Sequence, residues 1–300
     1  MPPTEAEPKY TPAEISFHLH AFYTFLTTLH YYASDLKVAP SPDGWPSLSP
    51  ALCEQHHLRL YKSPLALQVL RHIPYFRETK PITSIHYKSI LIDWAVIGAE
   101  KFGYRYGGLE FPKDLYYDYF PMDMSQNISQ QDKIALWMEE QKLNYKPCNK
   151  DMILLSAGHE SGGRNIWLDV VHGRIWEDET RCDMVGNWDL VEYLDMMRGL
   201  LRDLKIIPAV GRVCLDSGHE TPERTVEEGE IHLEDVLQDT DERDGFFGTA
   251  LHVQFVRQEY RRMGWPDAFR KEEAEDWVRM LDRACEGRLE SSWEEEWWFL

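Results

Sequence analysis

Two stretches of the chain repeat apolar residues at helical spacing. Thr11 and Glu14 form a capping-box pattern around Pro12, which predicts that a helix starts there and runs to about Ser34. Its apolar face would comprise Ile15, Leu19, Phe22, Leu26 and Leu29. A second helix is predicted after Asn187, with the apolar face Leu190, Leu194, Met197, Leu201 and Leu204. We expect both faces to pack against a core.

Shorter helical signals flank these two stretches. Ser49 and Ser63 are each followed by proline, which is typical of a helix cap and a first helical position. Apolar spacing predicts further helices over residues 129–143, 249–263 and 271–285.

The stretch from Met152 to Trp176 has a different pattern, because short apolar runs alternate there with glycines. Ile153–Leu155 and Asn165–Val171 read as strands, and His172-Gly173 has the spacing of a two-residue hairpin loop before a third strand. Ile90–Trp94 is the best additional strand candidate. The chain is therefore predicted to be an α+β protein with a meander at its centre.

The order of these patterns suggests one main domain with additions. We expect residues 1–38 to supply a helix that packs on the core, and residues 39–215 to form the α+β core domain. Residues 216–248 would be a mobile acidic insert, and residues 249–300 would add C-terminal helices and an aromatic tail.

The net charge of the chain indicates which kinds of partner it can bind. The chain has 51 acidic and 32 basic residues, a net charge of -19. This balance disfavours nucleic-acid binding, which depends on lysine and arginine, and favours a basic protein partner. Residues 216–245 hold 12 acids against Arg224 and Arg243, a net of -10, so this segment is expected to be a solvated loop; mimicry of a polyanion is a further reading.

Targeting and redox signals point to the cell interior. The first residues lack a basic and apolar leader pattern, and no apolar run approaches the roughly 20 residues of a membrane span. The five cysteines include no CxxC pair, as expected of reduced thiols. We therefore expect a cytoplasmic or nuclear protein without a membrane partner.

A metal site is the sharpest enzyme hypothesis. His159, Asp169 and His172 are suitable zinc ligands, and a hairpin could bring some of them together. However, the HExxH pattern is absent, and three residues of separation on one strand would start Asp169 and His172 on opposite faces. Ordinary loop residues are favoured and no cofactor is expected; a metal-binding protein or metal-dependent hydrolase remains the alternative.

Several features resemble the SUKH superfamily, which groups fungal regulators of cell-wall synthesis with bacterial toxin-immunity proteins. The matching residues lie between Trp45 and Pro208: Trp45-Pro46, Ile73-Pro74-Tyr75, Leu168-Asp169, Gly173, Arg174-Ile175, Trp188 and Tyr193-Leu194. The proline-led helix and asparagine-glycine turn of that family have no clear counterpart here. The resemblance implies one antiparallel sheet flanked by helices, non-enzymatic protein binding and no catalytic residues.

A partner surface can be proposed beside the meander. We expect Arg164, Arg174 and Trp176 to line a groove there, because arginine and tryptophan are common energetic anchors of interfaces. Alanine at these positions should then weaken partner binding with little loss of stability. Trp297 and Trp298 in the aromatic tail would dock either on the protein's own core or on the partner. The oligomeric state is left open.

Overall fold

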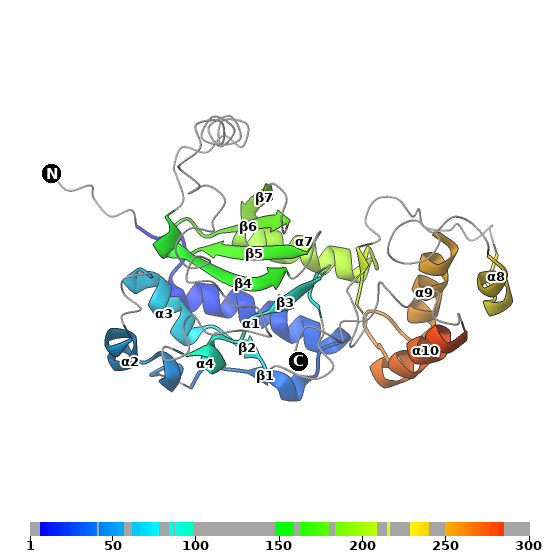
Figure 1. The fold of residues 1–300 in the computed structure, drawn as a ribbon, viewed down its shortest axis with the longest axis horizontal. Coiled ribbons are helices and arrows are strands. Elements are labelled where there is room, and N and C mark those ends of the chain that lie inside the picture. Colours follow the sequence, from blue (N-terminus) through cyan, green and yellow to red (C-terminus); the bar gives the residue numbers. More distant parts are fainter. Residues whose placement is uncertain are drawn as a thin grey trace.

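A five-stranded antiparallel sheet forms the centre of the computed structural model (Figure 1), in the order β3-β4-β5-β6-β7. The strands are β3 (Ser89–Leu91), β4 (Met152–Gly158), β5 (Arg164–Asp169), β6 (Arg174–Glu179) and β7 (Met184–Asp189). The structure describes residues 7–40, 42–56, 62–77, 84–86, 88–98, 148–158, 163–179, 184–208, 215–216, 229–239 and 250–284. The predicted α+β class is confirmed, and the helix predicted over residues 129–143 lies outside the described ranges.

The meander predicted from Met152 to Trp176 is present as β4, β5 and β6, but its second turn differs. β5 ends at Asp169, which pairs with Arg174, so the turn has four residues and not two. The cause is the Asp169 carboxylate, which accepts hydrogen bonds from the backbone N–H groups of Val171 and His172. A side chain that bonds its own backbone two and three residues ahead competes with strand pairing.

β7 is an additional strand at the edge of this sheet. Asn187, after which the helix was predicted to begin, pairs with Trp176 inside the sheet. The cap is Asp189, whose carboxylate accepts from the backbone N–H of Val191 at the start of α7 (Leu190–Arg202). The segment Met184–Asp189 contains Gly186 and lacks strict alternation, so its sequence carries a weak strand signal.

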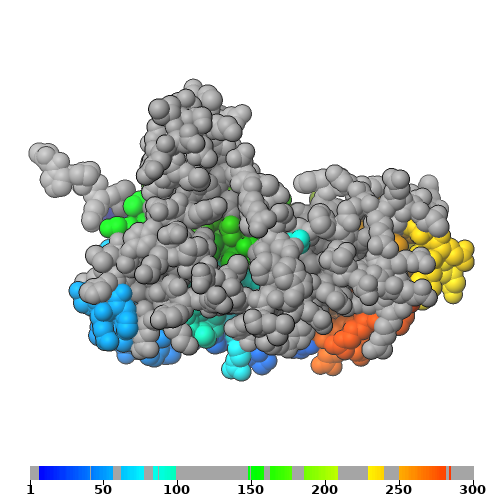
Figure 2. All heavy atoms as spheres, viewed as in Figure 1, coloured from blue at the N-terminus to red at the C-terminus, as the bar shows by residue number. Residues whose placement is uncertain are grey.

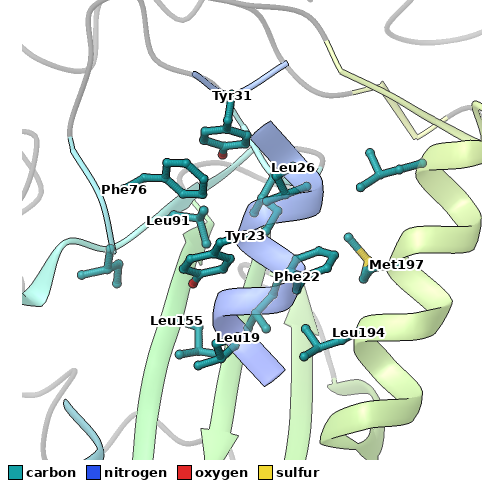
Figure 3. Close-up of a cluster of buried hydrophobic side chains, with 14 of the residues drawn as sticks. Leu19, Phe22, Tyr23, Leu26, Tyr31, Phe76, Leu91, Leu155, Leu194 and Met197 are labelled. Carbon is teal, nitrogen blue, oxygen red and sulfur yellow. The ribbon is translucent and has the colours of Figure 1, made fainter. Parts of the chain in front are cut away.

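Helix α1 (Pro12–Leu29) lies beside α7 and packs against the sheet, as Figure 3 shows. Tyr23 of α1 points towards Leu155 of β4, whereas Phe22 points towards Leu194 and Met197 of α7. The predicted capping box at Thr11 is formed, and the five predicted apolar residues of α1 are all buried. The helix ends at Leu29, earlier than the expected Ser34. Burial of aliphatic and aromatic side chains between two helices and a sheet is the main stabilising term of this core.

Short elements complete the core. Ser49 and Ser63 cap α2 and α3 as predicted, each accepting from a backbone N–H three residues on. The predicted strand at Ile90–Trp94 is divided, because Asp93 caps α4 after β3 has ended. The short elements are η1 (Ala33–Asp35), β1 (Leu36–Lys37), η2 (Pro46–Leu48), α2 (Pro50–Gln55), α3 (Pro64–His72), β2 (Tyr75–Phe76), α4 (Trp94–Ile97), η5 (Asn149–Asp151), β8 (Ile206–Ile207) and β9 (Leu215–Asp216). β1 pairs with β2, and β8 pairs with β9.

The C-terminal helices α8 (Leu233–Gln238), α9 (Ala250–Arg262) and α10 (Lys271–Ala284) gather at one end of the molecule (Figure 1). They are joined to the core through carbonyl groups at the ends of α1 and α7. The Lys271 ammonium donates to the carbonyls of Thr27 and Tyr31, at 2.9 Å each. The Trp265 indole donates to the carbonyl of Leu201 at 3.0 Å. These donors bond to carbonyls in and just beyond the last turns of α1 and α7, the region where a helix has carbonyls without internal partners.

The acidic segment contains regular structure that the sequence did not predict. Residues 229–239 include α8, with Ile231 and Val236 buried. The Gln258 side chain of α9 bonds both the N–H and the carbonyl of Ile231, at 2.9 Å each. This part of the expected mobile insert is therefore a short helix packed on α9, and most of the remaining segment lies outside the described residues.

Gly173 in the β5–β6 turn can be tested against two other glycines that serve as comparisons. Gly173 has a φ of +62° and its missing Cβ would collide with the Tyr10 ring, whereas Gly229 has a φ of +75° with no atom near an added Cβ among the described residues. We expect Gly173→Ala to lower the free energy of unfolding by more than about 2 kcal/mol and Gly229→Ala by about 1 kcal/mol. Gly199→Ala, in open space on α7, should raise it by about 0.5 kcal/mol.

Urea unfolding of the three variants would measure these differences. Equal losses for Gly173→Ala and Gly229→Ala would show that the contact between Gly173 and Tyr10 contributes nothing beyond backbone strain.

Candidate functional site

The structure brings Asp169 and His172 together at the β5–β6 turn. The Asp169 side chain is 1% exposed, and one of its oxygens lies 2.9 Å from Nδ1 of His172. Because β5 ends at Asp169, strand alternation does not extend to His172, and the expectation that the two side chains point apart was wrong. Burial raises the pKa of Asp169, while the backbone and side chain of His172 and the backbone N–H of Val171 act in the opposite direction.

This pair does not by itself form a metal site. His159, the third proposed ligand, lies outside the described residues. Within the described ranges, no group of three His, Cys, Asp or Glu side chains could hold a metal ion. Both Asp169 oxygens already accept hydrogen bonds, from two backbone N–H groups and the His172 ring. In this arrangement the pair stabilises the turn.

The N-terminal segment is attached to the same end of the sheet through Asp189. The backbone N–H of Lys9 donates to the carbonyl of Val171 at 2.9 Å. The Lys9 ammonium lies 2.6 Å from the Asp189 carboxylate, and the Tyr10 hydroxyl donates to it at 3.0 Å. Burial favours a higher pKa for Asp189, but these donors outweigh it and lower that pKa. Burial and the bond to Asp189 raise the pKa of Tyr10 to about 12.

Arg174 is the predicted partner residue that keeps partial exposure at this end. Its Nε donates to the side-chain oxygen of Asn187 at 2.6 Å, and its backbone lies between those of Asp169 and Asp189 in the sheet register. The guanidinium is half-buried and has a fixed orientation. A planar, oriented guanidinium is suited to binding a carboxylate or a backbone carbonyl of a partner.

A second polar cluster occupies the opposite end of β5 and β6. Nε of Arg164 lies 3.6 Å from the Glu177 carboxylate, and Nε2 of His86 lies 3.8 Å from the same oxygen. The Tyr193 hydroxyl of α7 donates to the other oxygen at 3.2 Å. Burial, followed by the charge of Glu177, raises the pKa of Tyr193 well above its ordinary value, so the phenol stays protonated.

This cluster behaves as a charge-compensated network. Glu177 is 4% exposed and Tyr193 is 2% exposed, so a substrate could not reach them without rearrangement. A buried carboxylate is tolerated when a cation and hydrogen-bond donors surround it, and removal of one partner is costly. We conclude that the cluster holds β5, β6 and α7 together.

The sequence analysis missed Glu177 and His86. A signal was available for Glu177, because it is two residues beyond Ile175 on the same strand and therefore on the same face. Ile175 is completely buried, so a carboxylate on that face required a partner. The partner His86 lies far away in sequence, and no local pattern links the two residues.

Trp176 does not fit the proposed partner groove. It is completely buried in the core, and the Arg164 side chain is only 19% exposed and lies against Glu177. The reason is that the middle strands are covered on both faces, as the continuous burial along β4 also shows, so strand alternation does not give an exposed face. Trp297 and Trp298 lie outside the described residues.

A further buried charge was not predicted. The Lys62 side chain is 3% exposed, and its ammonium donates to the carbonyl of Met152 at the start of β4. Burial lowers the pKa of Lys62 to about 8, although Asp151 and Cys148 oppose this shift.

Comparison with protein-family models, curated proteins and solved structures finds no match to this chain. Of the helices formed by the described residues, none is both long and apolar enough to span a membrane.

The two arginines of the hairpin should differ in their effect on stability. Arg164→Ala leaves Glu177 buried without its guanidinium partner, and we expect a loss of about 3 kcal/mol in the free energy of unfolding. Arg174→Ala removes a hydrogen bond at a half-buried position and should cost about 1 kcal/mol. Chemical denaturation measures both values. If Arg164→Ala were as mild as Arg174→Ala, the Glu177 network would not be stabilising.

Lys62 should make stability depend on pH in the alkaline range. Its pKa is about 8 in the folded protein and near 10.5 when unfolded, so between these values the unfolded chain binds more protons. Unfolding free energy should therefore rise with pH across this window, by about 3 kcal/mol in total from this group. Lys62→Met should abolish the rise, while Lys205→Met, at an exposed position, should retain it. Denaturant titrations from pH 7 to pH 10.5 test this, and identical pH profiles for the two variants would contradict it.

Proposed function

We propose that this protein is a non-enzymatic, SUKH-like interaction module that binds a basic protein partner through an acidic surface. An antiparallel sheet flanked by helices agrees with the fold that the resemblance implies. The contacts of three polar residues also support a non-enzymatic role. Asp169 bonds to His172 and Glu177 lies against Arg164, and both contacts stabilise the fold.

The observation that carries this proposal is the distribution of charge. Four acidic residues are buried among the described residues, and each lies against a basic group: Asp93 with Lys37, Asp169 with His172, Glu177 with Arg164, and Asp189 with Lys9. With histidine counted as neutral, these four acids and the three lysine and arginine partners carry one net negative charge, so 18 of the 19 excess charges belong to residues outside these pairs. An acidic surface of this kind attracts a basic partner and accelerates its association.

Helix α8 is the best-defined part of this surface. Glu230, Glu234 and Asp235 are exposed on and beside it, and we call these residues the α8 acidic face. Glu230 also forms an ion pair with Arg262, and Asp235 accepts a hydrogen bond from the backbone N–H of His232. Figure 2 shows α8 in yellow at the surface, at one end of the molecule. Buried Val236 and the hydrogen bonds between Gln258 and Ile231 attach α8 to α9, so the α8 acidic face is held in place on α9. The sequence segment 216–245, to which α8 belongs, carries the net charge of -10.

Neutralising the α8 acidic face should weaken partner binding. We expect Glu230→Gln/Glu234→Gln to reduce affinity for the partner about two- to tenfold and to flatten its salt dependence, because each exposed ion pair contributes only modestly. The matched control is Glu272→Gln/Glu273→Gln, which makes the same charge change at exposed positions of α10.

The measurement has two stages. Affinity capture from the native organism, eluted with increasing salt and quantified by mass spectrometry, identifies the partner; fluorescence anisotropy with that purified partner then compares the variants. Capture of a neutral or acidic partner that resists high salt would contradict the proposal, as would equal losses for both variants.

A further inference from the structure

A small pocket lies where the end of α1 meets α9 and α10. Its cavity volume is about 30 Å³, and its walls come from both the core and the C-terminal helices. The residues relevant to its chemistry are His30, Tyr260, Phe269, Lys271, Glu275 and Arg279. A ligand bound there would contact both parts of the molecule at once.

His30 is the unusual member of this pocket. It follows the last residue of α1, is 3% exposed, and neither ring nitrogen makes a hydrogen bond with the described part of the chain. The backbone of Ser84 lies near enough to oppose the pKa shift, yet it does not complete a hydrogen bond of normal geometry with the ring. Because buried polar groups are nearly always hydrogen-bonded, the imidazole indicates a missing partner in the pocket.

The protonation state of His30 defines what that partner must offer. Burial lowers the pKa of His30 to about 3, and the nearby Lys271 charge contributes in the same direction. The ring is therefore neutral at pH 7 and has one N–H donor and one acceptor nitrogen. Its donor can bind an anionic oxygen without bringing a second positive charge into the interior.

Lys271 supplies the positive charge. Two of its N–H groups donate to the carbonyls of Thr27 and Tyr31, and an ammonium has a third to offer. Arg279 lies 2.9 Å from Asp276 and 3.5 Å from Glu275, so these carboxylates compensate its charge. Burial lowers the pKa of Lys271, while the charges of Glu275 and Glu272 oppose this shift.

Tyr260 and Phe269 give the pocket an aromatic part of its lining, and Trp265 packs beside Phe269. The Tyr260 and Phe269 rings lie 5.2 Å apart, and the Trp265 ring lies 4.8 Å from Phe269. The Tyr260 hydroxyl is already committed, since it donates to the carbonyl of Pro208. An apolar part of a ligand would contact this lining, while its charged group faced His30 and Lys271.

We propose that this pocket binds the carboxylate of a small organic monoacid, with the His30 N–H and the Lys271 ammonium as donors. Its volume of about 30 Å³ corresponds to roughly two water-sized oxygens, which suits a carboxylate better than the four oxygens of a phosphate. A monoanion can pair with Lys271, whereas a dianion would bring a second negative charge next to Glu275, which also lines the pocket. The site is separate from the α8 acidic face, so its test is independent of the proposed partner.

Isothermal titration calorimetry of the full chain with sodium formate and with sodium acetate tests this site, with sodium chloride at equal ionic strength as the blank. We expect saturable binding that His30→Phe weakens at least about tenfold, because a hydrogen bond to a charged group is lost. His20→Phe, at an exposed position on α1, is the matched control and should bind like the wild type. Equal affinity in both variants, or no saturable binding of either acid by the wild type, would overturn the proposal.

An NMR measurement avoids dependence on the variants. In a long-range ¹H–¹⁵N spectrum of the wild type, the ring signals of His30 should shift on addition of acetate and not on addition of chloride. His30→Gln replaces His30→Phe for assignment and binding if the phenylalanine variant does not fold. Unshifted ring signals, or a crystal grown in acetate that holds only water in the pocket, would refute the site.

Discussion

Hydrogen bonds to backbone carbonyls at and just beyond the ends of α1 and α7 attach the C-terminal helices to the core. An α-helix leaves its last carbonyls without internal partners, and here Arg257 of α9, Lys271 of α10 and Trp265 between them donate to carbonyls of this region. The ammonium of Lys271 also complements the negative end of the α1 dipole. Because Lys271 is both a helix cap and a wall of the His30 pocket, the pocket exists only when this attachment is made.

The central hairpin is stabilised at both of its ends by carboxylates. Asp169 and Asp189 hold the β5–β6 turn, the N-terminal segment and the start of α7, whereas Glu177 joins β5, β6 and α7 at the other end. Apolar burial between these ends, through Leu168, Ile175 and Trp176, provides the larger stabilising term. The polar residues that first suggest a reaction centre thus define the register and orientation of the sheet.

The buried carboxylates that stabilise the sheet are not among the residues proposed to bind a ligand or a partner. Buried acids in the described residues have basic neighbours, and most of the acidic excess of the chain belongs to other residues. The α8 acidic face and the His30 pocket both depend on α9, through Gln258 in one case and Tyr260 in the other. Both proposed sites therefore lie at one end of the molecule, but their proposed ligands, a basic protein and a carboxylate, carry opposite charges.

The sequence by itself determined the elements whose signals are local. Thr11, Ser49 and Ser63 marked helix starts, the four-three spacing marked the buried faces of α1 and α7, and short apolar runs marked the meander. Caps and amphipathic faces involve residues within one or two turns, so they can be read from neighbouring positions.

Only the tertiary structure decided the contacts between distant residues. It placed Asn187 in an edge strand, buried Trp176, joined Asp169 to His172 within a turn, and gathered His86, Arg164 and Tyr193 around Glu177. It also packed α8 on α9 within an acidic segment. These outcomes depend on which side chains pack against each residue. The packing partners come from segments that lie far away in the sequence, so no local pattern specifies them.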